Sequence, residues 1–179
     1  MPQIEKETAL LGEIIAVAFD VDGVLTDGGF WWGPGGEEWK RFSFADIMGV
    51  SLARRAGIEL ALISGEDSPL VVRYAKKMHI QHVFMGCRDK ETALRRFAEE
   101  ASVDLTKICF MGDDLNDLPA MKIAGFSAAP ANAVADILAY ADFTARSIGG
   151  NGAVRELVEA LLRARGTSPQ EVYFDGKSK

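Results

Sequence analysis

The sequence predicts an α/β fold built on a doubly wound parallel sheet. Short continuous apolar runs, typical of strands buried on both faces, alternate with stretches of helical periodicity. Polar side chains follow several of these runs directly, and the carboxyl ends of parallel strands are where ligands bind. The 179 residues are 48% hydrophobic and 26% charged, a globular composition that excludes disordered and fibrous proteins.

The strand and helix candidates alternate along the chain. The first and strongest apolar run covers residues 14–21 and leads into Asp22 and Gly23. The expected strands are 14–21, 58–63, 82–84, 107–111 and 125–128. The expected helices are 46–56, 68–78, 89–101, 115–123, 132–139 and 152–164. This alternation favours repeated βαβ units.

One segment interrupts the alternation. Residues 28–44 carry all three tryptophans, Trp31, Trp32 and Trp39, around a Gly and Pro cluster, which predicts a β-hairpin. The hairpin could fold back on its own core or bury an apolar surface against another subunit. A two-stranded hairpin is marginal alone, so we favour the second interpretation.

Composition and the N-terminal sequence indicate the partners and the cellular compartment of the protein. Acidic residues outnumber basic ones by 26 to 20, the net charge is −6, and the absence of a basic run argues against nucleic-acid binding. Two cysteines are too few for a disulfide framework, which favours a reducing compartment. The sequence around Glu5 and Glu7 lacks the apolar core of a signal peptide, and no run reaches membrane-spanning length. We therefore expect a cytoplasmic protein without a membrane partner.

Residues suited to catalysis and metal binding occur at four places along the chain, each at or just beyond the end of an expected strand. Asp20 and Asp22 are two apart, so both side chains point the same way on an extended strand and repel each other unless a cation intervenes. Asp113 adds another carboxylate, and oxygen ligands of this kind suit Mg²⁺. Ser64 and Lys90 offer a hydroxyl and a positive charge to a phosphoryl group. Together they predict phosphoryl transfer through an aspartyl-phosphate.

Each motif has an ordinary explanation when taken alone. A pair such as Asp20 and Asp22 commonly caps a helix or forms a turn, Ser64-Gly65 is an ordinary turn, and Lys90 is a solvated helix residue. Their occurrence in order, each at or just beyond the end of an expected strand, favours the catalytic interpretation.

Four motifs resemble those of the haloacid dehalogenase phosphatase superfamily: residues 20–28, Ser64-Gly65, Lys90 and residues 112–117. The resemblance implies a Rossmann-like core with Asp20 as nucleophile and Asp22 as general acid and then base. By the same resemblance Ser64 and Lys90 hold phosphate, and Mg²⁺ is bound by Asp20, the Asp22 carbonyl and Asp113. Asn116 and Asp117 would support the metal site.

The resemblance also implies a capless enzyme. The two insertion points for a cap hold only the hairpin and a helix with a short strand, so a neighbouring subunit would complete the site. Residues 148–156 are similar to the GGxGAxRE tail of capless sugar-acid phosphatases, which implies a homotetramer. That group includes 3-deoxy-manno-octulosonate (KDO) 8-phosphate and nonulosonate 9-phosphate phosphatases, of lipopolysaccharide and sialic acid biosynthesis.

The substrate pocket departs from the KDO enzymes. Their typical Arg after the second-motif glycine is Glu66 here, and their pocket arginines would fall at Ser51 and Tyr74. Glu66 and Lys77 resemble the branch acting on nine-carbon acids, which favours a nonulosonate 9-phosphate over KDO 8-phosphate, although Glu66 could be a helix-start acid. Gly65 and Asp46 are further pocket residues by this resemblance.

Two other classes of protein share some of these features. A response-regulator receiver uses similar residues in a different order, with its lysine last. A non-catalytic oligomerisation module, like the phosphatase-like domain of CMP-sialate synthetase, would not need Asp20, Asp22, Lys90 and Asp113 together. We expect residues 1–166 to form one hydrolase domain and residues 167–179 a loose tail.

Overall fold

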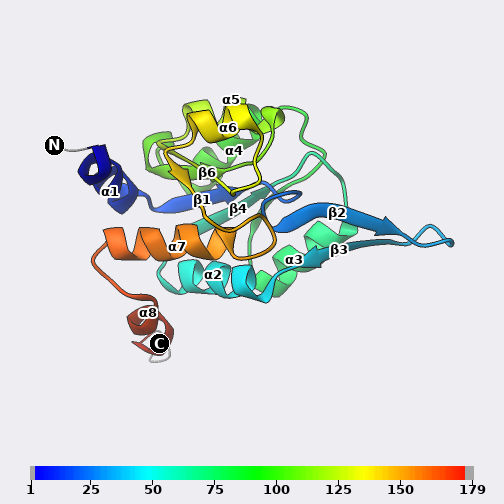
Figure 1. Ribbon diagram of the computed structural model, residues 1–179, viewed down its shortest axis with the longest axis horizontal. Coiled ribbons are helices and arrows are strands. Elements are labelled where there is room, and N and C mark those ends of the chain that lie inside the picture. Colours follow the sequence, from blue (N-terminus) through cyan, green and yellow to red (C-terminus); the bar gives the residue numbers. More distant parts are fainter. Residues whose placement is uncertain (1–2, 176–179) are drawn as a thin grey trace.

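A six-stranded sheet forms the centre of the computed structural model, which describes residues 3–175 (Figure 1). All neighbouring strands are parallel, in the order β5-β4-β1-β6-β7-β8. The strands are β1 (Ala16–Phe19), β4 (Glu59–Ile63), β5 (His82–Phe84), β6 (Ile108–Met111), β7 (Phe126–Ala129) and β8 (Phe143–Thr144). The predicted doubly wound α/β fold is confirmed.

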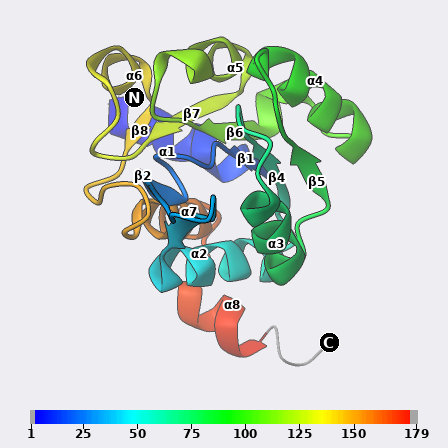
Figure 2. The same ribbon diagram turned by 90° about the vertical axis from the view of Figure 1, so that its right-hand side faces the viewer.

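Helices cover both faces of the sheet (Figure 2). Alternate residues of β1 face opposite sides, so Val17 and Phe19 enter one core while Ala16 and Ala18 enter the other. The first core is closed by α1 (Gln3–Glu13), α2 (Phe44–Arg55), α3 (Pro69–Met78) and α7 (Ala153–Ala164). The second is closed by α4 (Lys90–Ala101), α5 (Leu118–Ile123) and α6 (Ala135–Tyr140).

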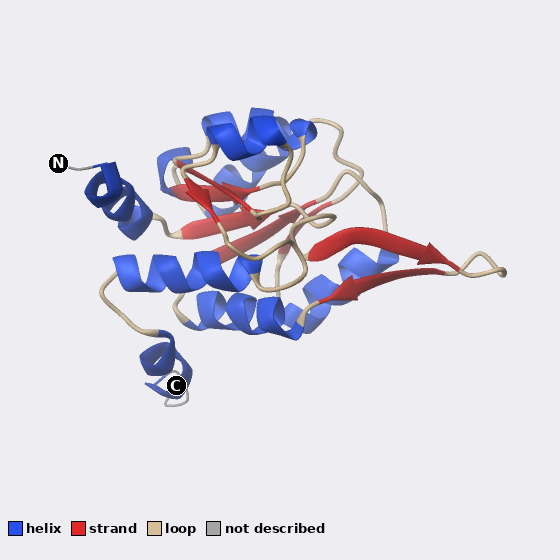
Figure 3. Cartoon of the chain, in the orientation of Figure 1, coloured by secondary structure: helices blue, strands red, loops and turns tan. Residues whose placement is uncertain are grey.

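The predicted hairpin is present as a separate two-stranded sheet that projects from the body (Figure 3). Its strands, β2 (Thr26–Trp32) and β3 (Glu38–Phe42), are antiparallel, with Trp31 opposite Trp39. All three tryptophans are exposed, and Trp32 keeps 73% of its accessible surface. Between Ser64 and Lys90 lie only α3 and β5, so neither insertion point holds a cap domain.

The expectation of a loose tail is wrong for residues 169–175, which form helix α8 (Pro169–Asp175). Ser168 and Glu171 explain the helix, because each side chain accepts a hydrogen bond from the other's backbone N–H. This reciprocal arrangement is a capping box, and Pro169 suits the first helical position. Residues 176–179 of the expected tail lie outside the described part of the chain.

None of the helices in residues 3–175 is long and apolar enough to cross a membrane.

Candidate active site

The central strands deliver the predicted residues to one edge of the sheet. Asp20 follows β1, Ser64 follows β4 and Asp113 comes two residues after β6, and β1 lies between the other two strands. Their ends surround a cavity of about 140 Å³. It is lined by Asp20, Asp22, Gly65, Glu66, Lys90, Asp113, Asp114 and Asn116. The structure therefore brings these residues together at the carboxyl edge, and their role as a site stays a prediction.

Lys90 is buried between two carboxylates. Its Nζ lies 2.6 Å from Oδ1 of Asp20 and 2.6 Å from Oδ1 of Asp117. Burial opposes the charge on Lys90, but the two neighbouring carboxylates raise its pKa above the ordinary value. The ammonium group therefore stays positive and orders both acids.

Asp117 holds the loop after β6 in place. It is fully buried, and its Oδ2 accepts hydrogen bonds from the backbone N–H groups of Asp113 at 2.9 Å and Asp114 at 3.2 Å. With Lys90 on Oδ1, both of its oxygens are engaged. This bonding fits a supporting role better than direct metal ligation.

Three carboxylates form a cluster that could hold a cation. One oxygen from each of Asp20, Asp113 and Asp117 lies within 4.8 Å of the other two. Burial, followed by the charge of Asp117, raises the pKa of Asp20 well above its usual range and that of Asp113 to about 6. A divalent cation would relieve this repulsion, and a set of oxygen donors suits Mg²⁺. The residues present therefore fit the predicted metal.

Gly23 makes room for the cluster. A Cβ at this position would lie 2.0 Å from Oδ2 of Asp113, and the backbone φ is +100°. Any side chain there would clash with Asp113 and strain the backbone.

Ser64 is fully buried and does not line the cavity, whereas Gly65 and Glu66 do. The Ser64 Oγ accepts a hydrogen bond from the Glu66 N–H at 3.1 Å. Ser64 thus shapes the turn that presents the two following residues to the cavity.

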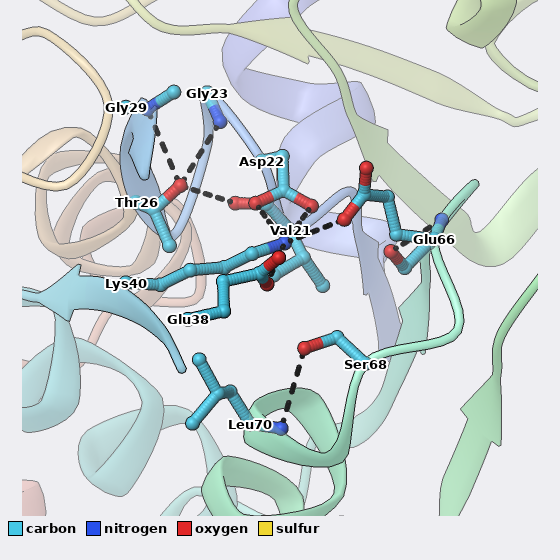
Figure 4. A network of polar contacts seen from close by, with 12 residues as sticks. Val21, Asp22, Gly23, Thr26, Gly29, Glu38, Lys40, Glu66, Ser68 and Leu70 are labelled. Atoms are coloured by element: carbon cyan, nitrogen blue, oxygen red, sulfur yellow. Dashed lines mark hydrogen bonds and ion pairs between the residues drawn. The ribbon is translucent and has the colours of Figure 1, made fainter. Parts of the chain in front are cut away.

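Lys40 is a site residue that the sequence analysis missed. From β3 of the hairpin its Nζ reaches both oxygens of Asp22, at 2.8 and 2.9 Å, and Oε2 of Glu66 at 3.1 Å (Figure 4). Although burial opposes its charge, these two acids raise the pKa of Lys40. The sequence around Lys40 predicts only a strand of the hairpin. Its contact with Asp22, 18 residues away, depends on the tertiary fold and could not be predicted from that sequence.

Asp46 lies apart from this cavity. It is 1% exposed, and its carboxylate accepts hydrogen bonds from the N–H groups of Gly152, Val154 and Arg155 at 3.0, 3.1 and 3.3 Å. Asp46 thus caps the N-terminus of α7 from helix α2. This arrangement supports a structural role in place of the predicted substrate contact.

Lys77 lines a second cavity of about 360 Å³, beside the hairpin. Arg73, Tyr74 and Lys40 line it too, so Lys40 adjoins both cavities. Within the described residues, no ion pair is made by Arg73 or Lys77. The second cavity therefore offers unpaired positive charge next to the candidate site.

The glycine-rich segment 149–152 packs against its own chain. A Cβ on Gly149 would lie 1.7 Å from the Gly23 carbonyl oxygen, and the Gly150 N–H donates to Val24 O at 2.9 Å. These glycines thus permit close contact with the loop that carries Asp22, and they give no support to an approach to a neighbouring subunit.

Comparison with known sequences agrees with the motifs. A family profile of haloacid dehalogenase-like hydrolases matches residues 76–157. The chain is 38% identical over 147 residues to the 3-deoxy-D-manno-octulosonate 8-phosphate phosphatase KdsC of Escherichia coli K12, covering 82% of this chain and 78% of that one. It is 37% identical over 158 residues to KdsC of Haemophilus influenzae, covering 88% of each chain.

Solved structures are similar as well. The Moraxella catarrhalis 3-deoxy-D-manno-octulosonate 8-phosphate phosphatase, in complex with magnesium, phosphate and KDO, superposes with a TM-score of 0.88. It is 36% identical, and the match covers 91% of this chain and 94% of that one. The cobalt-bound Haemophilus influenzae enzyme gives a TM-score of 0.88 at 36% identity, over 95% and 99% of the two chains.

Proposed function

The chain belongs to the haloacid dehalogenase-like hydrolase family, and on that premise we propose that it hydrolyses the phosphate ester of a keto-deoxy sugar acid. Within the family it is a Mg²⁺-dependent phosphatase of the capless sugar-acid group. The observation that carries the proposal is the placement of Asp20, beside Lys90 and the acidic cluster, at the end of the central strand.

In the proposed first step, the Asp20 carboxylate attacks phosphorus and forms the aspartyl-phosphate. The ester P–O bond breaks, and Asp22 gives a proton to the departing sugar oxygen. In the second step Asp22 takes a proton from water, the resulting hydroxide attacks phosphorus, and inorganic phosphate leaves Asp20 free. Lys90 offsets negative charge at Asp20 throughout.

Asp20, Asp113 and the Asp22 carbonyl would hold Mg²⁺, since the Asp117 oxygens are already engaged. When bound, the cation supplies positive charge to the phosphoryl oxygens. Asn116 lines the cavity and, with Asp117, would support this arrangement.

KDO 8-phosphate is the first candidate substrate, because the matched relatives with an assigned activity carry that name. The preference for a nonulosonate 9-phosphate stays a prediction, and two observations support testing it. Glu66 lines the candidate cavity, and Lys77 and Arg73 line the neighbouring one. The positive charges of Lys77 and Arg73 suit a substrate carboxylate.

The test is turnover of both sugar-acid phosphates by wild type, Glu66→Gln and Lys77→Ala. The proposal requires phosphate release from at least one of them at a kcat/KM well above that for a generic ester such as p-nitrophenyl phosphate. If Glu66 and Lys77 contact the sugar acid, their variants should lose efficiency on it and keep efficiency on the generic ester. Turnover of the generic ester alone would contradict the proposed substrate class.

We further propose that the chain assembles as a homotetramer through the hairpin. The exposed side chains of Trp31, Trp32 and Trp39 support this, as does Phe44, which keeps 80% of its accessible surface at the start of α2. A capless site is open to water, and a neighbouring subunit would close it.

A further inference from the structure

The carboxyl edge of the main sheet, with Asp20, Asp22, Lys90, Asp113 and Asp117, is called the catalytic edge below. Lys40 approaches this edge from the hairpin, outside the main sheet. It lies on β3 of the hairpin, whereas Asp22 lies in the loop after β1. The ammonium group of Lys40 contacts both oxygens of Asp22, at 2.8 and 2.9 Å. A cation on both oxygens restricts the carboxylate to few orientations.

The Lys40 side chain is itself held in place. Its surface is fully covered, and its Nζ also lies 3.1 Å from Oε2 of Glu66 and 3.9 Å from Oε1 of Glu38 (Figure 4). A lysine that is free in solvent would lose much rotamer entropy on fixing a carboxylate, but this side chain is already ordered by two other acids, Glu66 and Glu38. It is therefore a preformed support.

Asp22 depends on this support more than the other catalytic-edge acids do. Asp117 is fixed by two backbone N–H groups and by Lys90, and Asp20 is fixed by Lys90. For the Asp22 carboxylate, Lys40 is the partner that the described residues provide. Removing Lys40 would leave Asp22 free to rotate and close to the uncompensated charge of Glu66.

We propose that Lys40 is a positioning residue, which orients the Asp22 carboxyl group so that Asp22, in its protonated form, can give its proton to the departing oxygen. The inference rests on the proposed function of Asp22 as general acid. In that step the proton passes from Asp22 to the leaving oxygen while the P–O bond breaks and the bond from Asp20 to phosphorus forms. The hairpin thereby supplies part of the acid–base apparatus of a site whose nucleophile lies in the sheet.

The experiment compares leaving groups. Lys40→Met removes the charge and keeps an unbranched side chain, and Lys40→Gln is a second variant should the first fail to fold. We expect kcat/KM for a sugar-acid phosphate to fall about a hundredfold, because its departing sugar oxygen is strongly basic and needs the proton from Asp22. For 2,4-dinitrophenyl phosphate, whose leaving group needs no proton, kcat/KM should change little. Lys122→Met, an exposed lysine on α5, is the matched control and should behave as wild type on both esters.

An equal loss on both esters, or no loss on either, would overturn the inference. Asp22→Asn separates it from the proposed function, because that variant should also lose far more on the sugar phosphate. If Asp22→Asn shows this discrimination and the Lys40 variants do not, the positioning role is wrong and the role of Asp22 stands. If Asp22→Asn shows none, the assigned acid is wrong and the inference fails with it.

Discussion

The side chains of the catalytic edge and of the hairpin differ in burial and in contacts. At the edge, Asp20, Lys90 and Asp117 are buried and meet each other's charges within one chain. On the hairpin, Trp31 and Trp32 are large apolar side chains left exposed. The difference supports the proposals that the catalytic groups come from one chain and that the hairpin buries its aromatic rings against a further surface.

Asp20→Asn should have the largest effect. An amide is a poor nucleophile and a weaker metal ligand, so turnover should fall more than roughly a thousandfold while the fold is retained. Phosphate release measures the loss, and circular dichroism with a thermal melt checks the fold. Asp136→Asn, on the exposed side of α6, is the matched control. Substantial activity in Asp20→Asn would exclude the aspartyl-phosphate.

Removal of Mg²⁺ should stop turnover, and its return should restore it. Without the cation the acids at the edge repel an incoming phosphate. The Asp113 pKa of about 6 adds a pH dependence, because Mg²⁺ must displace a proton from that carboxyl below this pH. Apparent Mg²⁺ affinity should therefore weaken as the pH falls below about 6, by at least about tenfold per pH unit, because Asp20, whose pKa is also raised, binds a proton in competition with the cation as well. Calorimetric titration of Mg²⁺ at several pH values would check this, and a pH-independent affinity would contradict it.

Trp32→Glu tests the other half of the contrast. If the hairpin lies at an interface, a charge in place of this ring should cost several kcal/mol of association free energy. The variant should shift toward monomers in light scattering, and turnover of the sugar-acid phosphate should fall further than that of a generic ester. Trp32→Tyr should preserve the assembly. A fully active wild-type monomer at assay concentration would refute the interface.

Asp46→Asn should affect stability and leave catalysis nearly unchanged. The amide nitrogen would face backbone N–H groups at the start of α7, and the loss should be about 2 kcal/mol of unfolding free energy. That corresponds to a fall in Tm of about 4 to 8 °C. Thermal melts and steady-state kinetics would distinguish the two roles, since a large rise in KM at unchanged Tm would restore the predicted substrate contact.

The sequence was most informative where function depends on residues at strand ends. Strands follow from apolar runs, and parallel neighbours bring their ends together, so the placement of Asp20 and Asp113 could be predicted without coordinates. Predicted strand boundaries were accurate to about two residues, as at β4 (Glu59–Ile63) against residues 58–63.

Contacts between distant segments could not be predicted in this way. The reach of Lys40 to Asp22 depends on how the hairpin bends back, and the cap formed by Asp46 depends on the packing of α2 against α7. The sequence alone therefore could not distinguish a pocket role for Asp46 from its role as a cap of α7. Helix α8 is a different case, because Ser168 and Glu171 were a readable capping signal in the sequence of the Gly- and Pro-containing tail.

The central position of β1 has a consequence for how the enzyme loses activity. β1 is hydrogen-bonded to β4 on one side and β6 on the other, whereas β2 and β3 pair only with each other. Amide hydrogens of β1 should exchange with solvent only when the whole sheet opens, and those of the hairpin should exchange earlier through local opening. Asp20, the proposed nucleophile, thus sits at the end of one of the strands expected to exchange most slowly. Mild heat or denaturant should first disturb the residues that reach the site from the hairpin, Lys40 among them, and reach Asp20 only with global unfolding.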